Sequence, residues 1–276
     1  MKTSKYYFIC SFFIVLILLG WTVCLSFQYY APPSYRKPFQ MKQEAEDTLR
    51  IAYIGDSWAY WHKDHECQIA QILENTLHCP VKVHSYGICG RTSREIYENM
   101  FENSDFNDFL TKRRYEYCYV SAGINDTHKK MSIPYYQQSI NYIIQLMLTN
   151  NVHPIIQEIP DYDIKKIDNN QKFYKKFIRR LYMYFHDMPI DCKQMFRDAL
   201  DNLIQEKGYQ DRVSIIRYKT WNNDFSKDLN HLYWHDHLHL NENGYAKLDS
   251  AIANVILTIY WHNNEPQQES DACNHR

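Results

Sequence analysis

The chain has 276 residues, 45% of them hydrophobic, which is enough for one sizeable domain with an ample core. Its formal net charge is −1, so no overall basic field favours nucleic acid as a partner. The eight cysteines show no paired Cys-x-x-Cys spacing, which argues against a structural zinc site of that type.

An apolar segment comes first in the chain. No charged residue lies between Tyr6 and Tyr30, and about 20 apolar residues are enough to cross a bilayer. The segment lacks the short apolar core and small-x-small exit of a cleavable signal peptide, and no small residue precedes Cys24 as a lipoprotein would require. We therefore expect residues 1–30 to form a cytoplasmic tip and a single transmembrane signal-anchor.

The orientation of this anchor does not follow from charge. Arg36, Lys37 and Lys42 lie just beyond the segment and rival Lys2 and Lys5 under the positive-inside rule. A single N-terminal anchor followed by a large domain usually exports that domain, so we expect the domain to be extracytoplasmic or periplasmic.

The rest of the chain divides by composition. The Pro-containing polar stretch 31–48 is typical of a linker, and the polar stretch 263–276 is typical of a disordered tail. Residues 49–262 are left as the folded domain, and no internal repeat is visible. In an oxidising compartment Cys67 and Cys79 are the pair closest to a sensible local disulfide loop.

Within the domain, short apolar runs alternate with stretches of helical periodicity. Strands are predicted at 50–55, 81–87, 115–123, 152–160 and 212–218, and helices at 61–78, 92–103, 134–150, 170–186, 192–207 and 242–259. This alternation predicts an α/β fold, a three-layer α/β/α sandwich around a five-stranded parallel sheet.

Polar or glycine-containing segments follow several of these strands. Ser57 comes after the first strand, and the segments 87–93 and 123–126 come after the second and third. The segment 236–239 follows the last strand after a loop. Ligand sites in such sheets lie outside the carboxyl ends of the strands, so all four segments are expected at one rim.

These segments contain the residue types that nucleophilic catalysis requires. A serine hydroxyl needs a base to take its proton and a third group to orient that base. Asp236 and His239 are three residues apart and would share one face of a helical turn. The N–H groups of Ser57 and Gly90 and the amide of Asn125 could donate to an oxyanion.

Four sequence blocks carry a family resemblance. "IGDSW", "YGICGRTS", "AGIND" and "DHLHLNENGY" occur in that order between residues 50 and 261, and together they resemble the SGNH (GDSL) hydrolases. The resemblance implies a flavodoxin-like fold and acyl transfer from an ester to water, with no metal or cofactor. It implies Ser57 as nucleophile, His239 as general base and Asp236 as its orienter, and it makes Ser57, Gly90 and Asn125 the oxyanion hole.

The chain departs from the family pattern in two places. Trp58 stands where many members have Leu, and the long helical stretch 161–210 is a candidate cap. Candidate substrate contacts are Asp56, Trp58, Asp126 and His237. Asp56 also fits a role in stabilising the turn, and Asn125 opens a glycosylation sequon, although an amide donor fits this rim better.

A metal-dependent hydrolase is the alternative of a different class. Residues 231–239 contain four histidines around Asp236, and His62 and His65 lie in another histidine-containing segment. On a strand His235, His237 and His239 would share one face and could ligate zinc or iron. This alternative leaves the Gly-Asp-Ser and Gly-Ile-Asn-Asp segments unexplained.

The basic stretch 172–185 interleaves Lys and Arg with aromatic residues. It fits an amphipathic helix with a solvated charged face, or a helix that contacts an anionic polysaccharide or a membrane surface.

Taken together, the sequence predicts a membrane-anchored serine esterase. Its anchored position and 24 tyrosines fit removal of an O-acetyl group from a cell-surface or extracellular carbohydrate. Alternatives are an O-acyltransferase of the same fold acting on a polysaccharide, and a non-catalytic domain that binds glycan.

Overall fold

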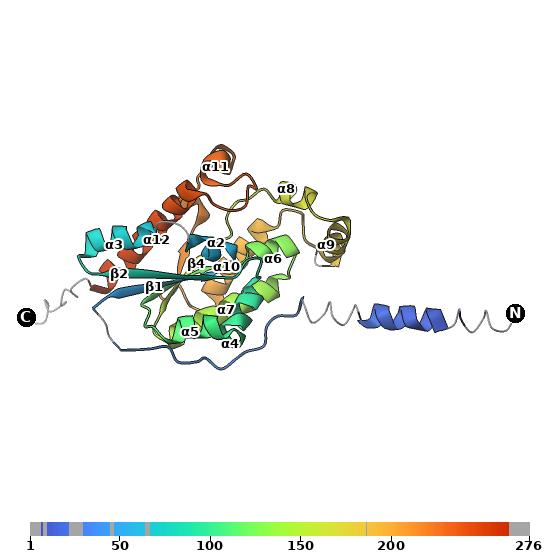
Figure 1. Ribbon diagram of the computed structural model, residues 1–276, viewed down its shortest axis with the longest axis horizontal. Helices are drawn as coiled ribbons and strands as arrows, with labels where there is room; N and C mark the ends of the chain where they lie inside the picture. Colours follow the sequence, from blue (N-terminus) through green and yellow to red (C-terminus); the bar gives the residue numbers. More distant parts are fainter. Residues whose placement is uncertain are drawn as a thin grey trace, which may run out of the picture.

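A five-stranded parallel sheet forms the centre of the molecule. The computed structural model describes residues 7, 10–21, 30–44, 47–63, 67–185 and 187–264 (Figure 1). The strand order is β2-β1-β3-β4-β5, and every neighbouring pair is parallel. The strands are β1 (Leu49–Gly55), β2 (Val81–Gly87), β3 (Tyr117–Ser121), β4 (His153–Gln157) and β5 (Ser214–Ile216). All five predicted strands are present, the last three shorter than expected.

Alternation along the strands divides the core in two. In β1, Ala52 and Ile54 belong to one buried cluster, whereas Ile51 and Tyr53 belong to the other, because successive side chains point to opposite faces. The first cluster is completed by α4 (Ser93–Glu102), α5 (Ser104–Thr111), α7 (Ile133–Thr149) and α10 (Lys193–Glu206). The second is completed by α2 (Ser57–His62), α3 (Gln68–Leu77), α11 (Phe225–Leu232) and α12 (Glu242–Asn264). The predicted three-layer architecture is therefore confirmed.

Several helix predictions need correction. The stretch 61–78 is not one helix, because α2 ends at His62 and α3 begins at Gln68. The short helices α5 and α6 (Ile124–Lys129) have too few turns to show a clear apolar period in the sequence. Only part of the predicted cap 161–210 stands outside the layers, because α10 buries Phe196 and Leu200 in the core.

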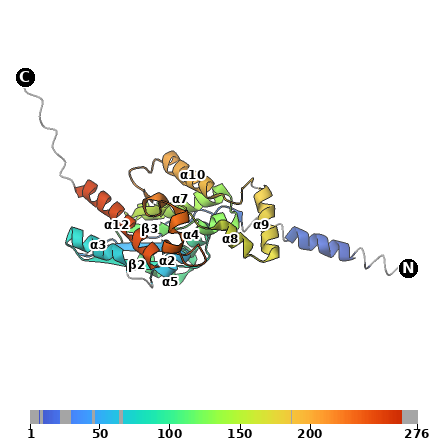
Figure 2. The ribbon, with the colours of Figure 1, turned by 90° about the horizontal axis from the view of Figure 1, so that it is seen from above.

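The remaining part of that stretch forms α8 (Ile164–Asn169) and α9 (Phe173–Phe185). Figures 1 and 2 both place α9 at the end of the molecule from which the N-terminal segment departs. Tyr30 stacks on Tyr182 of this helix, with ring centroids 3.6 Å apart. The chain that leads from residues 1–29 therefore meets the domain at α9.

The predicted linker is packed against the domain along much of its length. The Met41 N–H donates to Asn150 Oδ1 over 2.7 Å, and the Asn150 amide donates to the Phe39 carbonyl over 3.0 Å. Met41 is buried, and Arg36 pairs with Glu102 of α4. Residues 31–44 thus behave as part of the folded unit and not as a free stalk, because their backbone and side chains find partners on it.

The structure describes only part of the predicted membrane segment. Residues 10–21 are helical and their side chains are exposed, while 8–9 and 22–29 lie outside the described residues. No helix among the residues described is both long enough and apolar enough to cross a membrane. At the other end α12 runs to Asn264, two residues into the predicted tail, and 265–276 lie outside the description.

Candidate active site

Ser57 lies where the first strand gives way to a helix. β1 ends at Gly55, and the side chain of Asp56 caps α2 by accepting the Trp58 N–H over 3.0 Å. Ser57 is the first residue of α2, so its own N–H lies in the first turn, where no intrahelical acceptor is available. Its side chain is 8% exposed.

A loop from the far end of the chain brings the predicted base to this serine. His239 Nε2 lies 2.9 Å from Ser57 Oγ, and His239 Nδ1 lies 2.6 Å from Asp236 Oδ2. The two loop residues are in an Asx-type turn and not in the predicted helical turn: Asp236 Oδ1 accepts the N–H groups of Leu238 and His239, each over 3.0 Å. The structure brings all three predicted triad residues into one hydrogen-bonded chain.

The same hydrogen bonds set the charge of Asp236. Burial raises the pKa of its carboxyl, but the hydrogen bonds from the His239 ring and from the Leu238 and His239 backbones outweigh burial. The pKa of Asp236 is therefore held below its ordinary value. Asp236 is an anion at neutral pH, which is the state that orients and stabilises an imidazolium.

The predicted oxyanion glycine lies in a turn after β2. The Ile88 N–H donates to the Gly55 carbonyl over 3.1 Å, which fixes this loop beside the start of α2. Gly90 has φ +74°, and a Cβ there would meet no atom within 4 Å. Glycine is favoured at this position because the backbone φ is positive, and not because a side chain would lack space. At Gly87 a side chain is excluded by lack of space, because a Cβ would lie 2.1 Å from the Tyr60 backbone nitrogen.

Asn125, the second predicted oxyanion donor, is positioned by Asp56. Asn125 Nδ2 donates to Asp56 Oδ2 over 3.0 Å, and Ser121 Oγ donates to Asp56 Oδ1 over 3.3 Å. One amide proton of Asn125 is used in this bond and the other remains for a ligand. Burial raises the pKa of Asp56 to about 6, against the opposing effect of these hydrogen bonds.

Three of the four candidate substrate contacts are fully buried. Asp126 accepts the Ser93 N–H over 2.8 Å and the Ser93 hydroxyl over 2.6 Å, and burial raises its pKa to about 7. Trp58 packs edge-on against Trp221 with centroids 5.9 Å apart. With Asp56, these side chains have 0% exposure, so they hold the site together and offer no surface to a substrate.

The fourth candidate, His237, supports the catalytic loop. Its backbone has φ +58°, and its carbonyl accepts the Asp163 N–H over 3.1 Å. Its Nε2 lies 3.1 Å from Lys166 Nζ, which also donates to the His235 carbonyl over 2.6 Å. The segment that leads into α8 therefore braces the turn on which Asp236 and His239 sit.

The histidines of 231–239 do not form the metal cluster that the alternative required. Residues 235–239 are in turns and bends, so they do not alternate on one face of a strand. Both ring nitrogens of His239 face other partners, Ser57 and Asp236. Within the described part of the chain, three or more metal-ligating side chains converge only at His62, Cys67 and Asp249.

The sequence reasoning missed several supporting residues. Ser121 and Ser93 bind the two buried aspartates, and Lys129 donates to the Gly90 carbonyl over 2.8 Å. Ser93 is the last residue of the second block and Ser121 ends a strand at the same rim, so their positions were available as a signal. Nothing in the sequence points to Lys129 or Lys166, because their partners are set by chain segments far away.

Two of the three predicted triad residues are partly exposed, whereas Ser57 is buried. His239 and Asp236 keep 27% and 41% of their side chains exposed. Two hollows of the described surface, of about 360 and about 250 Å³, are lined by other residues. Ser57 is 8% exposed and lines neither hollow.

Comparison with known proteins agrees with this fold. No family model matches the chain, and no curated protein matches its sequence. Among solved structures, the lipase/acylhydrolase from Enterococcus faecalis superposes with a TM-score of 0.52 at 14% identity, over 75% of this chain and 95% of that one. The acetyl xylan esterase AlAXEase gives a TM-score of 0.52 at 13% identity, over 75% and 100%. The chain therefore shares the overall fold of these two solved structures.

Proposed function

We propose that this protein is a serine esterase that hydrolyses an O-acyl ester through an acyl-enzyme. The observation that carries the proposal is the continuous hydrogen-bond chain Ser57–His239–Asp236, with steps of 2.9 and 2.6 Å. Both distances are within the range that proton transfer between nucleophile, base and orienter needs.

Each step follows from this geometry. Ser57 Oγ attacks the ester carbonyl carbon while its proton passes to His239 Nε2, and Asp236 stabilises the imidazolium that forms. The N–H groups of Ser57 and Gly90 and the amide of Asn125 donate to the oxyanion. His239 then gives its proton to the leaving alkoxide. Water attacks the acyl-enzyme with His239 as base, which releases the carboxylic acid and returns a proton to Ser57.

An acetyl ester on a carbohydrate is the substrate we favour. His239 and Asp236 are partly exposed while Ser57 is buried, which suits a small acyl group that enters the site and a large acceptor that stays outside it. The acetyl xylan esterase among the structural neighbours acts on a substrate of this kind and has the same fold. At 13% identity that neighbour supports the choice through the fold alone.

We further propose that residues 1–30 anchor the enzyme in a membrane with its domain outside the cytoplasm. The apolar run between Tyr6 and Tyr30 is the basis. α9 fits a position at the bilayer surface, since Phe173, Phe177 and Leu181 are 83%, 62% and 43% exposed and basic residues alternate with them. The Tyr30–Tyr182 stack joins this helix to the end of the predicted anchor.

Labelling of the full chain in detergent by a fluorophosphonate probe tests the mechanism. Wild type should react, and Ser57→Ala and His239→Ala should not. Ser250→Ala, at a half-buried serine, and His231→Ala, at an exposed histidine, are controls of the same residue types and should react like wild type. Labelling that survives in Ser57→Ala, or that a chelator abolishes, would contradict the proposal.

The substrate needs a separate measurement. Acetate release from O-acetylated xylan is compared with release of long-chain acids from lipid esters, with Ser57→Ala as blank. Preference for the lipid esters would overturn the carbohydrate assignment. Transfer of acetyl to an added glycan acceptor, in place of release to water, would make the protein an O-acyltransferase.

A further inference from the structure

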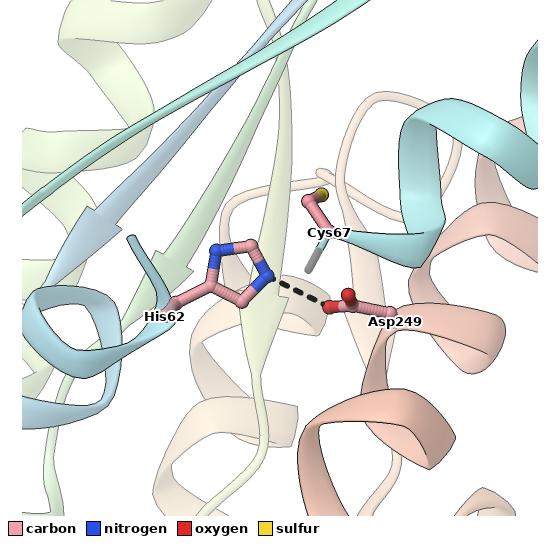
Figure 3. Close-up of side chains that lie close together, drawn as sticks. All are labelled: His62, Cys67 and Asp249. Carbon is pink, nitrogen blue, oxygen red and sulfur yellow. Dashed lines mark hydrogen bonds and ion pairs between the residues drawn. The ribbon is translucent and has the colours of Figure 1, made fainter. Parts of the chain in front are cut away.

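A second group of chemically active side chains lies at the opposite end of α2 from Ser57. His62 ends α2, Cys67 directly precedes α3, and Asp249 lies in the first half of α12. One ligand atom from each lies within 4.8 Å of the other two. Figure 3 shows the imidazole and the carboxylate facing each other, with the Cys67 side chain beside them.

The hydrogen bonds of His62 leave one nitrogen directed into this group. Nδ1 lies 2.8 Å from Ser85 Oγ, and Nε2 lies 2.9 Å from Asp249 Oδ1. When Nδ1–H donates to Ser85, Nε2 presents a lone pair to a carboxylate oxygen that also carries lone pairs. A proton on Nε2 satisfies this contact, and a metal ion that replaces the proton would bind Nε2 and Oδ1 together. Orientation by a partner on the other nitrogen is the usual arrangement of a metal-binding histidine.

A hydrogen bond also fixes the orientation of the Asp249 carboxylate. Its second oxygen, Oδ2, accepts the Gln68 N–H at the start of α3 over 3.0 Å. This bond fixes the carboxylate plane and turns Oδ1 toward His62. Both side chains are 1% exposed, so neither can satisfy its remaining polar atoms with bulk water.

The surroundings suit a compact divalent ion. The Tyr53 ring stacks on His62 with centroids 3.9 Å apart, and the Tyr245 ring meets it edge-on at 5.7 Å. Such aromatic walls lower the local dielectric. A cysteine thiolate and an aspartate together carry two negative charges, which neutralise a divalent cation in that setting.

We propose that His62, Cys67 and Asp249 form a binding site for a divalent transition metal of the zinc class. Mixed nitrogen, sulfur and oxygen ligands match the borderline-soft character of zinc, with a fourth position for water. The site was not evident as a motif because its ligands are not paired in sequence. The structure also leaves Cys67 free for this role, since the predicted disulfide is absent and both Cys67 and Cys79 are free thiols.

Such an ion would act on structure and not on the ester. It would join three helices of one layer, and it lies at the opposite end of α2 from Ser57. We expect a chelator to lower thermal stability while leaving fluorophosphonate labelling of Ser57 intact at low temperature. The metal site and the esterase proposal therefore fail independently.

Cobalt substitution tests the site in the full chain. Chelator-treated protein in detergent is titrated with Co²⁺, and one equivalent should produce a thiolate-to-cobalt charge-transfer band that Zn²⁺ bleaches. Cys67→Ser should abolish the band, whereas Cys79→Ser, a matched half-buried thiol, should keep it. Absence of the band in wild type, or its loss in Cys79→Ser but not in Cys67→Ser, would overturn the proposal.

A measurement on the unaltered chain guards against variants that fail to fold. Alkylation of Cys67 by iodoacetamide is followed by mass spectrometry with and without Zn²⁺, with Cys79 as internal reference. Zinc should slow alkylation of Cys67 at least tenfold and leave Cys79 unchanged. Equal rates with and without zinc would mean that His62 and Asp249 form only an imidazolium–carboxylate pair.

Discussion

Asn125 Nδ2 donates to Asp56 Oδ2 over 3.0 Å, so the buried carboxylate next to Ser57 holds the amide predicted to bind the oxyanion. Removing that amide should raise the barrier to the chemical step. We expect Asn125→Ala to lower kcat by about 100- to 1,000-fold with little change in KM, as measured on a small acetyl ester. A change confined to KM would mean that Asn125 binds the ground state only.

The carboxylate of Asp56 should act through Asn125. Asp56→Asn retains a helix-capping side chain but weakens the bond that orients the amide. We expect kcat to fall in Asp56→Asn, and the double variant with Asn125→Ala to be no slower than Asn125→Ala alone. Fully multiplicative losses would show that Asp56 contributes by another route.

Asp126 should make stability depend on pH. Burial raises its pKa from an ordinary 3.8 to about 7, so the folded state favours the neutral acid. In the unfolded chain Asp126 ionises near its ordinary pKa. Its contribution to the free energy of unfolding is therefore complete below about pH 4. It is lost as pH rises toward 7.

The measurement compares wild type with Asp126→Asn in urea unfolding between pH 4 and 8. The wild-type free energy of unfolding should fall relative to the variant by at most about 1.4 kcal/mol per pH unit, and the difference should level off above pH 7. Parallel curves across this range would contradict a raised pKa.

The basic residues of α9 other than the buried Arg179 should bind an anionic surface. Each Lys or Arg near such a surface contributes about 1 kcal/mol, so Lys175→Glu, Lys176→Glu and Arg180→Glu together should weaken binding to anionic vesicles by at least about 100-fold. Arg179 is left unchanged, because it is buried and pairs with Asp168. Residues 31–276 are used, so that the anchor itself does not dominate binding.

A second variant separates charge from burial in the bilayer. Phe177→Ser with Leu181→Ser removes apolar contact while keeping the charges, and it should weaken binding to vesicles but not to an anionic polysaccharide. Unchanged vesicle binding in both variants would show that α9 does not contact the membrane surface.

The linker should contribute to folding. Asn150 bonds both Met41 and Phe39, so Asn150→Ala leaves two linker backbone groups without their partner. We expect a loss of about 1–3 kcal/mol in the free energy of unfolding. Deleting residues 31–44 should cost at least as much, and a deletion without effect on thermal unfolding would show that the segment is not part of the folded unit.

Local pattern was sufficient for much of the architecture. The apolar run that became β1 ends close to its predicted limits because a buried parallel strand requires a continuous apolar stretch. The four blocks were correctly placed at one rim because the strands preceding the first three are parallel. The turn holding Asp236 and His239 was predicted as helical, since a spacing of three residues fits both a helix and an Asx turn.

The sequence by itself determined the layers, the rim and the identity of the residues that meet there, since periodicity and order are local properties of a chain. Only the tertiary structure decided what each polar side chain does. Asp56, Trp58 and Asp126 were candidates for substrate contact, and their burial made them supports. Cys67, expected beside Cys79, instead lies near His62 and Asp249. Burial and partners depend on segments far apart in sequence, and no local pattern records which of them will meet.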